Sequence, residues 1–290
     1  MLDQAEQLRK LVKKSEKNYE TNNQKRPVIL TITSGKGGVG KSNFVVNTAI
    51  CLQKMNKKVL IFDADIGMGN DDVLMGFLPK YSVYDIIFKG KNIEDVVIEG
   101  PFGIKLLPGG TGISKLNEIT EEQRDNFIKM LSKLEDIDYI IMDTGAGINK
   151  SVLGFITCCD YLFVVTTPEP TAITDAYSLI KVVDYFKIKN SASIIINKVF
   201  DNIEGEKVFN KFNAAVNRFL SINLNYLGCI SEDRKLVQAV KNQVPVVINF
   251  PSSAASEDIR NIVQKLLGVK SIKKDSGIQQ LFKRIFDIFS

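Results

Sequence analysis

The residues best suited to chemistry form a glycine-rich segment near the start of the chain. Gly35, Gly40, Lys41 and Ser42 occupy the fixed positions of the phosphate-loop pattern G-x-x-x-x-G-K-S/T. In such a loop the backbone N–H groups close on phosphate oxygens, the lysine reaches the β- and γ-phosphates, and the hydroxyl binds Mg²⁺. The segment therefore predicts a site for a nucleoside triphosphate and Mg²⁺. Its nucleotide-binding residues would be Gly35, Lys36, Gly37, Gly38, Val39, Gly40, Lys41, Ser42 and Asn43.

Acidic residues follow two apolar runs at the places where strands would end. Asp63 and Asp65 follow the run Val59–Phe62, and Asp143 follows Tyr139–Met142. Ligands of parallel α/β sheets bind at the carboxyl ends of the strands, so these acids should lie near the phosphate loop. An apolar strand that ends in Asp is also the Walker B arrangement, which binds Mg²⁺ directly or through water. The alternative for the first pair is a turn with two exposed acids.

These residues must be positioned by strands and helices. Sequence patterns typical of strands and of helices alternate along the chain from residue 28 to residue 268. This alternation predicts a doubly wound α/β fold, with a mostly parallel sheet and helices on both faces. The expected strands are Val28–Ile32, Val59–Phe62, Ile104–Leu107, Tyr139–Met142, Tyr161–Val165, Ile194–Ile196 and Tyr226–Ile230. The expected helices include Phe44–Met55, 121–134, 172–186 and 205–220.

Composition narrows the classes of function. The chain has 290 residues, 44% of them hydrophobic, and no histidine, which removes histidine acid–base catalysis and most zinc sites. The four cysteines lack metal-ligand spacing, so buried reduced thiols and a cytoplasmic setting are expected. The net charge is +5, with +3 in residues 1–26 and +3 in residues 269–290, which leaves the body near −1. A near-neutral body argues against a broad nucleic-acid-binding face.

Both ends of the chain differ from the body. Residues 1–17 have helical spacing and are followed by a polar linker at 18–27; a basic linker at 269–277 precedes a terminal segment at 278–290. The apolar side chains of this terminal segment fall within an arc of roughly 160° on a helix. They include Ile278, Leu281, Phe282, Ile285, Phe286 and Phe289. We expect an in-plane helix on an anionic membrane. The alternatives are a helix that packs on the body, or one that docks in the monomer and is released on dimerisation.

The loop GKGGVGKS resembles the deviant phosphate loop of the MinD/ParA superfamily of ATPases. The resemblance implies that ATP binds here and that Lys36 reaches the nucleotide of a partner subunit, so the active form would be an ATP-dependent homodimer. By the same resemblance Asp63 lies near Mg²⁺, with Ser42 and Asp143, and Asp65 positions the attacking water. Asn197, which follows an apolar run, would contact adenine. The catalytic residues would be Lys36, Lys41 and Asp65.

The segment DQAEQLR at residues 3–9 resembles the N-terminal motif of the FlhG (YlxH/FleN) family of flagellar number regulators. The resemblance extends to GKGGVGKS, DADIGMGN, DTGAGI and the amphipathic tail. It implies a slow, dimerisation-dependent ATPase that sets flagellar number and placement and lies on the inner face of the cell membrane when ATP-bound. It also implies that Gln4 enters the active site of an FlhF-type GTPase and stimulates it. Flagellar switch-complex proteins are further possible partners.

Other functions fit parts of the sequence. A MinD-type division-site regulator would share the loop and the tail but would not need DQAEQLR. A nucleotide-gated adaptor with incidental hydrolysis is another alternative, which a turnover assay would separate from an ATPase. A ParA-type DNA-partition ATPase is disfavoured by the near-neutral body and the membrane-like tail. A nitrogenase-reductase-like enzyme is excluded, because no cysteine lies between Cys51 and Cys158 to bind its cluster.

Overall fold

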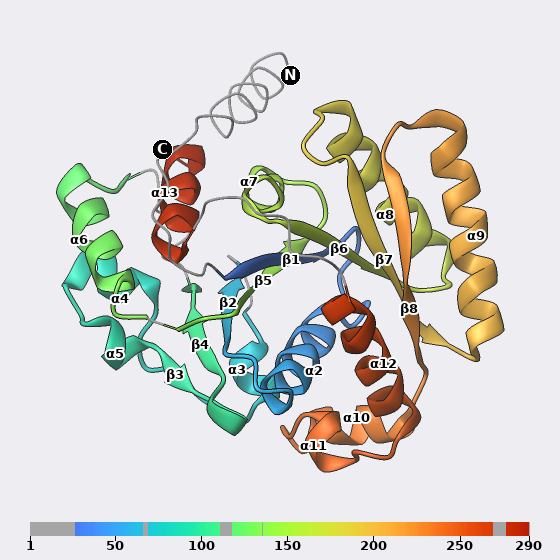
Figure 1. Cartoon of the computed structure of the whole chain (residues 1–290), viewed down its shortest axis with the longest axis horizontal. Coiled ribbons are helices and arrows are strands. Elements are labelled where there is room, and N and C mark those ends of the chain that lie inside the picture. Colours follow the sequence, from blue (N-terminus) through green and yellow to red (C-terminus); the bar gives the residue numbers. More distant parts are fainter. Residues whose placement is uncertain (1–26, 66–68, 111–117, 135, 269–276, 290) are drawn as a thin grey trace.

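A single sheet runs through the molecule with helices on both faces (Figure 1). The computed structural model describes residues 27–65, 69–110, 118–134, 136–268 and 277–289. Within these residues the sheet has eight strands in the order β3-β4-β2-β5-β1-β6-β7-β8, and all neighbours are parallel except β3 and β4. The strands are β1 (Val28–Ser34), β2 (Val59–Ala64), β3 (Ile98–Glu99), β4 (Lys105–Pro108), β5 (Tyr139–Ala146), β6 (Tyr161–Thr166), β7 (Ser191–Val199) and β8 (Asn223–Ser231).

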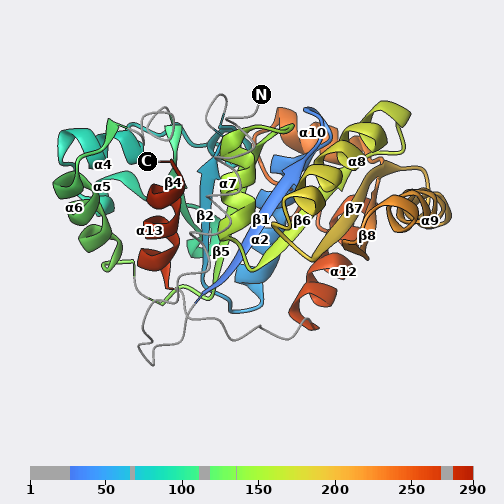
Figure 2. The same ribbon diagram turned by 90° about the horizontal axis from the view of Figure 1, so that it is seen from above.

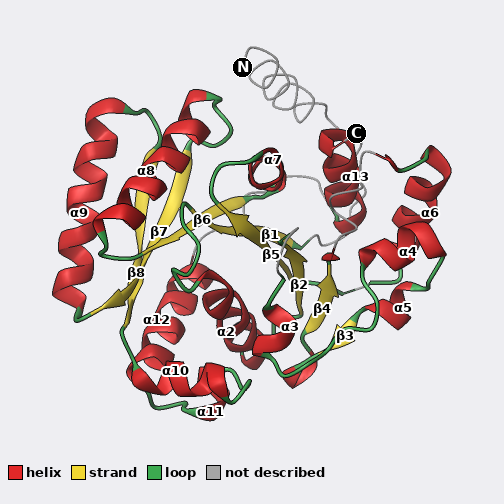
Figure 3. Ribbon diagram, turned by 180° about the vertical axis from the view of Figure 1, so that it is seen from behind, coloured by secondary structure: helices red, strands yellow, loops and turns green. Residues whose placement is uncertain are grey.

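The helices divide into two layers, one over each face of the sheet (Figures 1 and 3). One layer contains α4 (Val83–Lys89), α5 (Ile93–Val96), α6 (Glu121–Leu131), α7 (Lys150–Cys158), α8 (Pro170–Tyr185), α9 (Asn202–Phe219) and α13 (Ile278–Phe289). The other contains α2 (Lys41–Lys54), α3 (Asp71–Leu74), the short η1 (Pro101–Gly103), α10 (Arg234–Lys241), α11 (Val246–Asn249) and α12 (Ala254–Gly268). Alternate side chains of each central strand enter opposite layers, so Ile29 joins one apolar core and Leu30 the other. The doubly wound α/β fold expected from the alternating pattern is confirmed.

The strands extend beyond the apolar runs that predicted them. β5 and β7 continue into polar residues at their carboxyl ends, among them Asp143, Thr144 and Asn197. Hydrophobic runs miss these residues because the polar side chains are buried by the site rather than by the core. The short antiparallel strand β3 was not expected, since two residues are too few to show a period.

The terminal helix α13 packs on the body, alongside α6 and α7 (Figure 2). Its apolar face is buried: Leu281, Phe282 and Ile285 are at most 2% exposed. The ring of Phe282 lies 5.0 Å from that of Phe62 and 5.1 Å from that of Phe127, between ring centroids. The structure thus shows the docked arrangement that the sequence left open as an alternative, and membrane binding of the tail stays a prediction. Helical periodicity reports only that one face is apolar; it cannot distinguish a lipid surface from an aromatic groove in the same chain.

An ion pair and a close helix crossing hold α13 in place. The guanidinium of Arg124 donates to the carboxylate of Asp287 at 2.5 Å and lies over the ring of Phe286. On the other side, α7 presents Gly154, where an added Cβ would lie 2.8 Å from the side chain of Ile288. A larger residue at this position would push the two helices apart.

The expected helix at residues 1–17 lies outside the described residues, as do the 18–27 linker except Pro27 and the 269–277 linker except Gly277. The four cysteines are buried free thiols, as expected. Among the helices described, none is both long and apolar enough to cross a bilayer.

Candidate nucleotide-binding site

The phosphate loop connects the carboxyl end of β1 to α2 and depends on its glycines. Gly38 and Gly40 have φ values of 78° and 90°, a backbone conformation that favours glycine. A Cβ at Gly40 would also collide with the side-chain amide of Asn197, and one at Gly35 with the backbone of α8. No side chain within the described part of the chain caps the first turn of α2, so the N–H groups of this turn are available to an anion.

Lys41 bridges the loop and the neighbouring strand. Its ammonium donates to Oδ1 of Asp143 at 2.5 Å, and Oγ of Ser42 lies 3.5 Å away. Burial lowers the pKa of Lys41, but the attraction of Asp143 outweighs it and raises the pKa above its usual value. The lysine therefore stays charged inside the site, which phosphate binding would require.

The register of β2 and β5 brings two predicted carboxylates together. Asp63 pairs with Asp143 across the two strands, and both side chains are buried. Burial, followed by repulsion from Asp143, raises the pKa of Asp63 to about 7. The backbone N–H of Asp65 donates to Oδ1 of Asp63 at 3.2 Å, and a Cβ at Gly145 would lie 3.3 Å from the carboxylate of Asp65. The structure thus brings Asp63, Asp65, Asp143 and Lys41 to one edge of the sheet.

Lys36 lies on the surface of its own subunit. Its ammonium donates to Oε2 of Glu169 at 3.2 Å and to Oγ1 of Thr171 at 3.0 Å. The side chain is 41% exposed and that of Glu169 is 60% exposed. Its contact with the nucleotide of a partner subunit stays a prediction.

Asn197 holds the phosphate loop by a hydrogen bond to its backbone. Its Nδ2 donates to the carbonyl of Val39 at 2.7 Å, and its Oδ1 accepts from the N–H of Lys198 at 2.9 Å. The ammonium of Lys198 in turn donates to the carbonyl of Gly38 at 3.0 Å. Lys198 is a loop-supporting residue that the sequence analysis missed, although it directly follows Asn197. The adenine contact of Asn197 stays a prediction.

Asp71 is a second residue that the sequence analysis missed. It begins α3, is fully buried, and interacts with Asp143, Asp63 and Lys41. Burial, and then the nearby carboxylates of Asp143 and Asp63, raise its pKa well above the usual value. In the sequence it is one of two adjacent acids at a helix start, a common pattern on exposed helices.

The hydroxyl and carboxylate oxygens at this edge of the sheet are suitable ligands for Mg²⁺. Ser42 and Asp143 flank the same ammonium, and Asp63 lies beside Asp143 in the sheet. Hard cations such as Mg²⁺ prefer these hydroxyl and carboxylate ligands. Among the described residues, however, no three acidic or cysteine side chains could hold an ion by themselves. Phosphate oxygens of the nucleotide would therefore have to complete the coordination.

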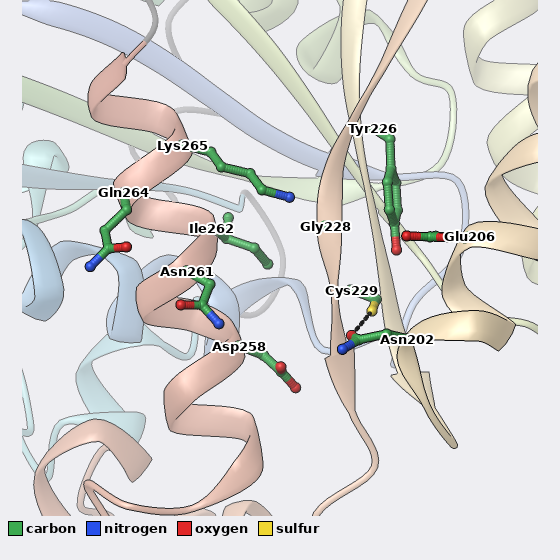
Figure 4. A pocket seen from close by; sticks show the side chains of 10 residues that line it. All are labelled: Asn202, Glu206, Tyr226, Gly228, Cys229, Asp258, Asn261, Ile262, Gln264 and Lys265. Carbon is green, nitrogen blue, oxygen red and sulfur yellow. Dashed lines mark hydrogen bonds between the residues drawn. The ribbon is translucent and has the colours of Figure 1, made fainter.

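A separate hollow of about 580 Å³ lies beside the edge strand β8, between α9 and α12 (Figure 4). Its wall includes Tyr226, Cys229, Asp258 and Lys265, and none of the phosphate-loop residues. The thiol of Cys229 donates to Oδ1 of Asn202 at 3.0 Å. Burial raises the pKa of this thiol, so it is a poor nucleophile and we assign it no catalytic role.

Comparison with known proteins agrees with this geometry. Residues 28–196 match the family model described as an AAA domain, which spans more than half of the chain. The chain is also similar to the solved structure of the MinD cell division protein of Aquifex aeolicus, with a TM-score of 0.67 and 26% sequence identity, over 85% of this chain and 99% of that one.

Two relatives at higher identity have flagellar names. The antiactivator FleN of Pseudomonas aeruginosa is 35% identical over 239 residues, which cover 82% of this chain and 85% of that protein. The flagellum site-determining protein YlxH of Helicobacter pylori is 34% identical over 292 residues, which cover 98% of both chains. With its phosphate loop, its carboxylates and its fold, the chain belongs to the FlhG (YlxH/FleN) family of MinD/ParA-type ATPases.

Proposed function

We propose that this ATPase is a dimeric, membrane-associating switch that regulates flagellar number and placement and acts on an FlhF-type GTPase. The observation that carries the proposal is the GKGGVGKS loop, set against buried carboxylates, in a chain whose relatives are named FleN and YlxH. Flagellar switch-complex proteins are its possible further partners. A division-site regulator would share the ATPase fold. The experiment on the N-terminal segment below distinguishes that function from the flagellar one.

Hydrolysis would depend on positioning and charge rather than on covalent chemistry. Lys41 would move from Asp143 to the phosphates, Asp65 would orient water, and Ser42, Asp63 and Asp143 would hold Mg²⁺. The ion supplies charge neutralisation when bound. Lys36 would leave Glu169 and Thr171 to reach the partner's nucleotide. Because that ion pair is largely exposed, little stability is lost when it breaks.

The site also connects to the tail. β5, which carries Asp143, leads within a few residues into α7, whose first turn is capped by Asn149. α7 then contacts α13 at Gly154. A change at residues 143–149 in response to the γ-phosphate would therefore reach the helix that holds the tail.

Docking and membrane binding use the same apolar face of α13. Seven of its apolar side chains are buried on the body, and each contributes about 1.5–3 kcal/mol when fully buried. A released helix therefore needs another apolar surface, and an anionic membrane supplies one. We infer that ATP-driven dimerisation releases α13 and that two tails together bind the inner face of the membrane more strongly than one.

Two substitutions at the site should have opposite effects on the dimer. With ATP and Mg²⁺, Asp65→Ala should accumulate as a dimer because it binds nucleotide but orients water poorly. Lys41→Ala should remain monomeric because it loses the phosphate-binding ammonium. Light scattering of the full chain measures both. Equal dimer fractions in the two variants would contradict the proposed mechanism.

Weakening the contact between α13 and the body should expose α13 in the absence of ATP. Arg124→Ala removes the ion pair with Asp287 but leaves the apolar face of α13 intact. We therefore expect more of this variant than of wild type to sediment with anionic liposomes in the absence of nucleotide. The matched control is Lys129→Ala, an exposed cation on the same helix α6, which should behave as wild type.

A double substitution identifies the membrane-binding surface. Phe282→Glu with Phe286→Glu should abolish sedimentation even with ATP, because two charges replace the apolar face. If this variant still binds liposomes, the membrane contact lies outside α13. If Arg124→Ala binds no better than wild type, the ion pair does not hold the tail closed.

The N-terminal segment should act on a partner GTPase. A peptide of residues 1–20 should stimulate an FlhF-type GTPase, because a supplied glutamine can orient the attacking water. The Gln4→Ala peptide should bind but stimulate much less. Equal stimulation by both peptides would remove the role of Gln4. Failure of both to bind would favour the division-site alternative.

A further inference from the structure

Asp71 is a buried carboxylate whose oxygens find no partner among the described donors. Its side chain has no exposed surface, and neither Oδ1 nor Oδ2 accepts a hydrogen bond within the part of the chain that the structure describes. Burying a carboxylate without a donor is costly. A leucine or an asparagine would fill the same position on α3 at a lower cost. The position therefore favours a role for the charge itself.

The surroundings of Asp71 are strongly acidic. Asp63, Asp71 and Asp143 are all buried, and Lys41 is the ammonium that interacts with all three. Among the described residues, the ammonium of Lys41 compensates one of the three carboxylates when all are ionised, which leaves two negative charges. If phosphate oxygens draw Lys41 away, as proposed above, the deficit grows to three. A hydrated divalent cation is the species that best matches it.

The backbone before α3 is built to bring Asp71 into this cluster. Gly69 lies so close to Asp63 that a Cβ would collide with Oδ2 of that carboxylate. The chain therefore passes directly over Asp63 and begins α3 two residues later at Asp71. A side chain at position 69 would force either the start of α3 or the carboxylate of Asp63 to shift.

We propose that Asp71 is a further carboxylate of the Mg²⁺ site, which positions the hydrated ion and raises its affinity. It would accept hydrogen bonds from the water molecules of the ion rather than bind the ion directly, since no three acidic side chains of the described residues could hold an ion alone. Mg²⁺ usually keeps several of its waters in nucleotide sites, so acceptors for them are needed. This inference rests on the Mg²⁺ site proposed above.

The test is a Mn²⁺ titration of the full chain loaded with ADP, followed by the electron paramagnetic resonance signal of free Mn²⁺. Asp71→Asn should weaken Mn²⁺ binding at least about tenfold, as loss of an outer-shell partner does at other metal sites. Asp143→Asn, which removes a proposed ligand, should weaken it at least as much. Asp125→Asn removes an exposed carboxylate from α6 and should leave the affinity unchanged.

A second measurement separates positioning from a structural role. In EDTA and without nucleotide, Asp71→Asn and Asp71→Leu should both unfold at a higher temperature than wild type, because they remove a buried carboxyl group whose oxygens accept no hydrogen bond from the described residues. A higher melting temperature together with weaker Mn²⁺ binding supports the proposal. A lower melting temperature in both variants would mean that Asp71 holds the fold, and would overturn it.

The titration also distinguishes this inference from the one on which it rests. If Asp143→Asn loses Mn²⁺ affinity and Asp71→Asn does not, the Mg²⁺ site stands and Asp71 has no part in it. If neither substitution changes the affinity, the Mg²⁺ site itself is wrong, and the role of Asp71 is overturned with it.

Discussion

The parallel pairing of β2 with β5 is the constraint on which the site depends. Its register sets Asp63 opposite Asp143, and both carboxylates are buried. Such a pair is unstable unless positive charge or hydrogen-bond donors reach it. Lys41 supplies the charge from the first turn of α2, and the loop that carries Lys41 is in turn held by Asn197 and Lys198. The buried carboxylates of the nucleotide site therefore destabilise the fold unless positive charge compensates them.

The same two strands, β2 and β5, connect the nucleotide site to the docked helix α13. Phe62 directly precedes Asp63 on β2, and its ring packs against Phe282 of α13. Beyond Asp143, β5 leads into α7, which contacts α13 at Gly154. The site and the tail thus lie at opposite ends of a few rigid elements. These contacts are the routes by which the proposed release of α13 would depend on the site.

Much of the fold and the main parts of the site could be predicted from the sequence, because each has a local signal. Gly35 to Ser42 form a fixed motif, and Asp63, Asp65 and Asp143 follow apolar runs. The burial of α13 could not be predicted, since Phe282 and Phe286 show the same spacing on a membrane and in a groove. Asp71 was missed because its burial depends on how Gly69 passes over Asp63. The bond from Asn197 to Val39 depends on two segments far apart in the chain.

The buried carboxylates should require a cation once a bound nucleotide draws Lys41 away from Asp143. The direct test is the melting temperature of the full chain in EDTA, with Mg²⁺ alone, with a non-hydrolysable ATP analogue in EDTA, and with both ligands. Mg²⁺ should raise the melting temperature much more in the presence of the analogue than in its absence. An equal shift from Mg²⁺ with and without the analogue would contradict it.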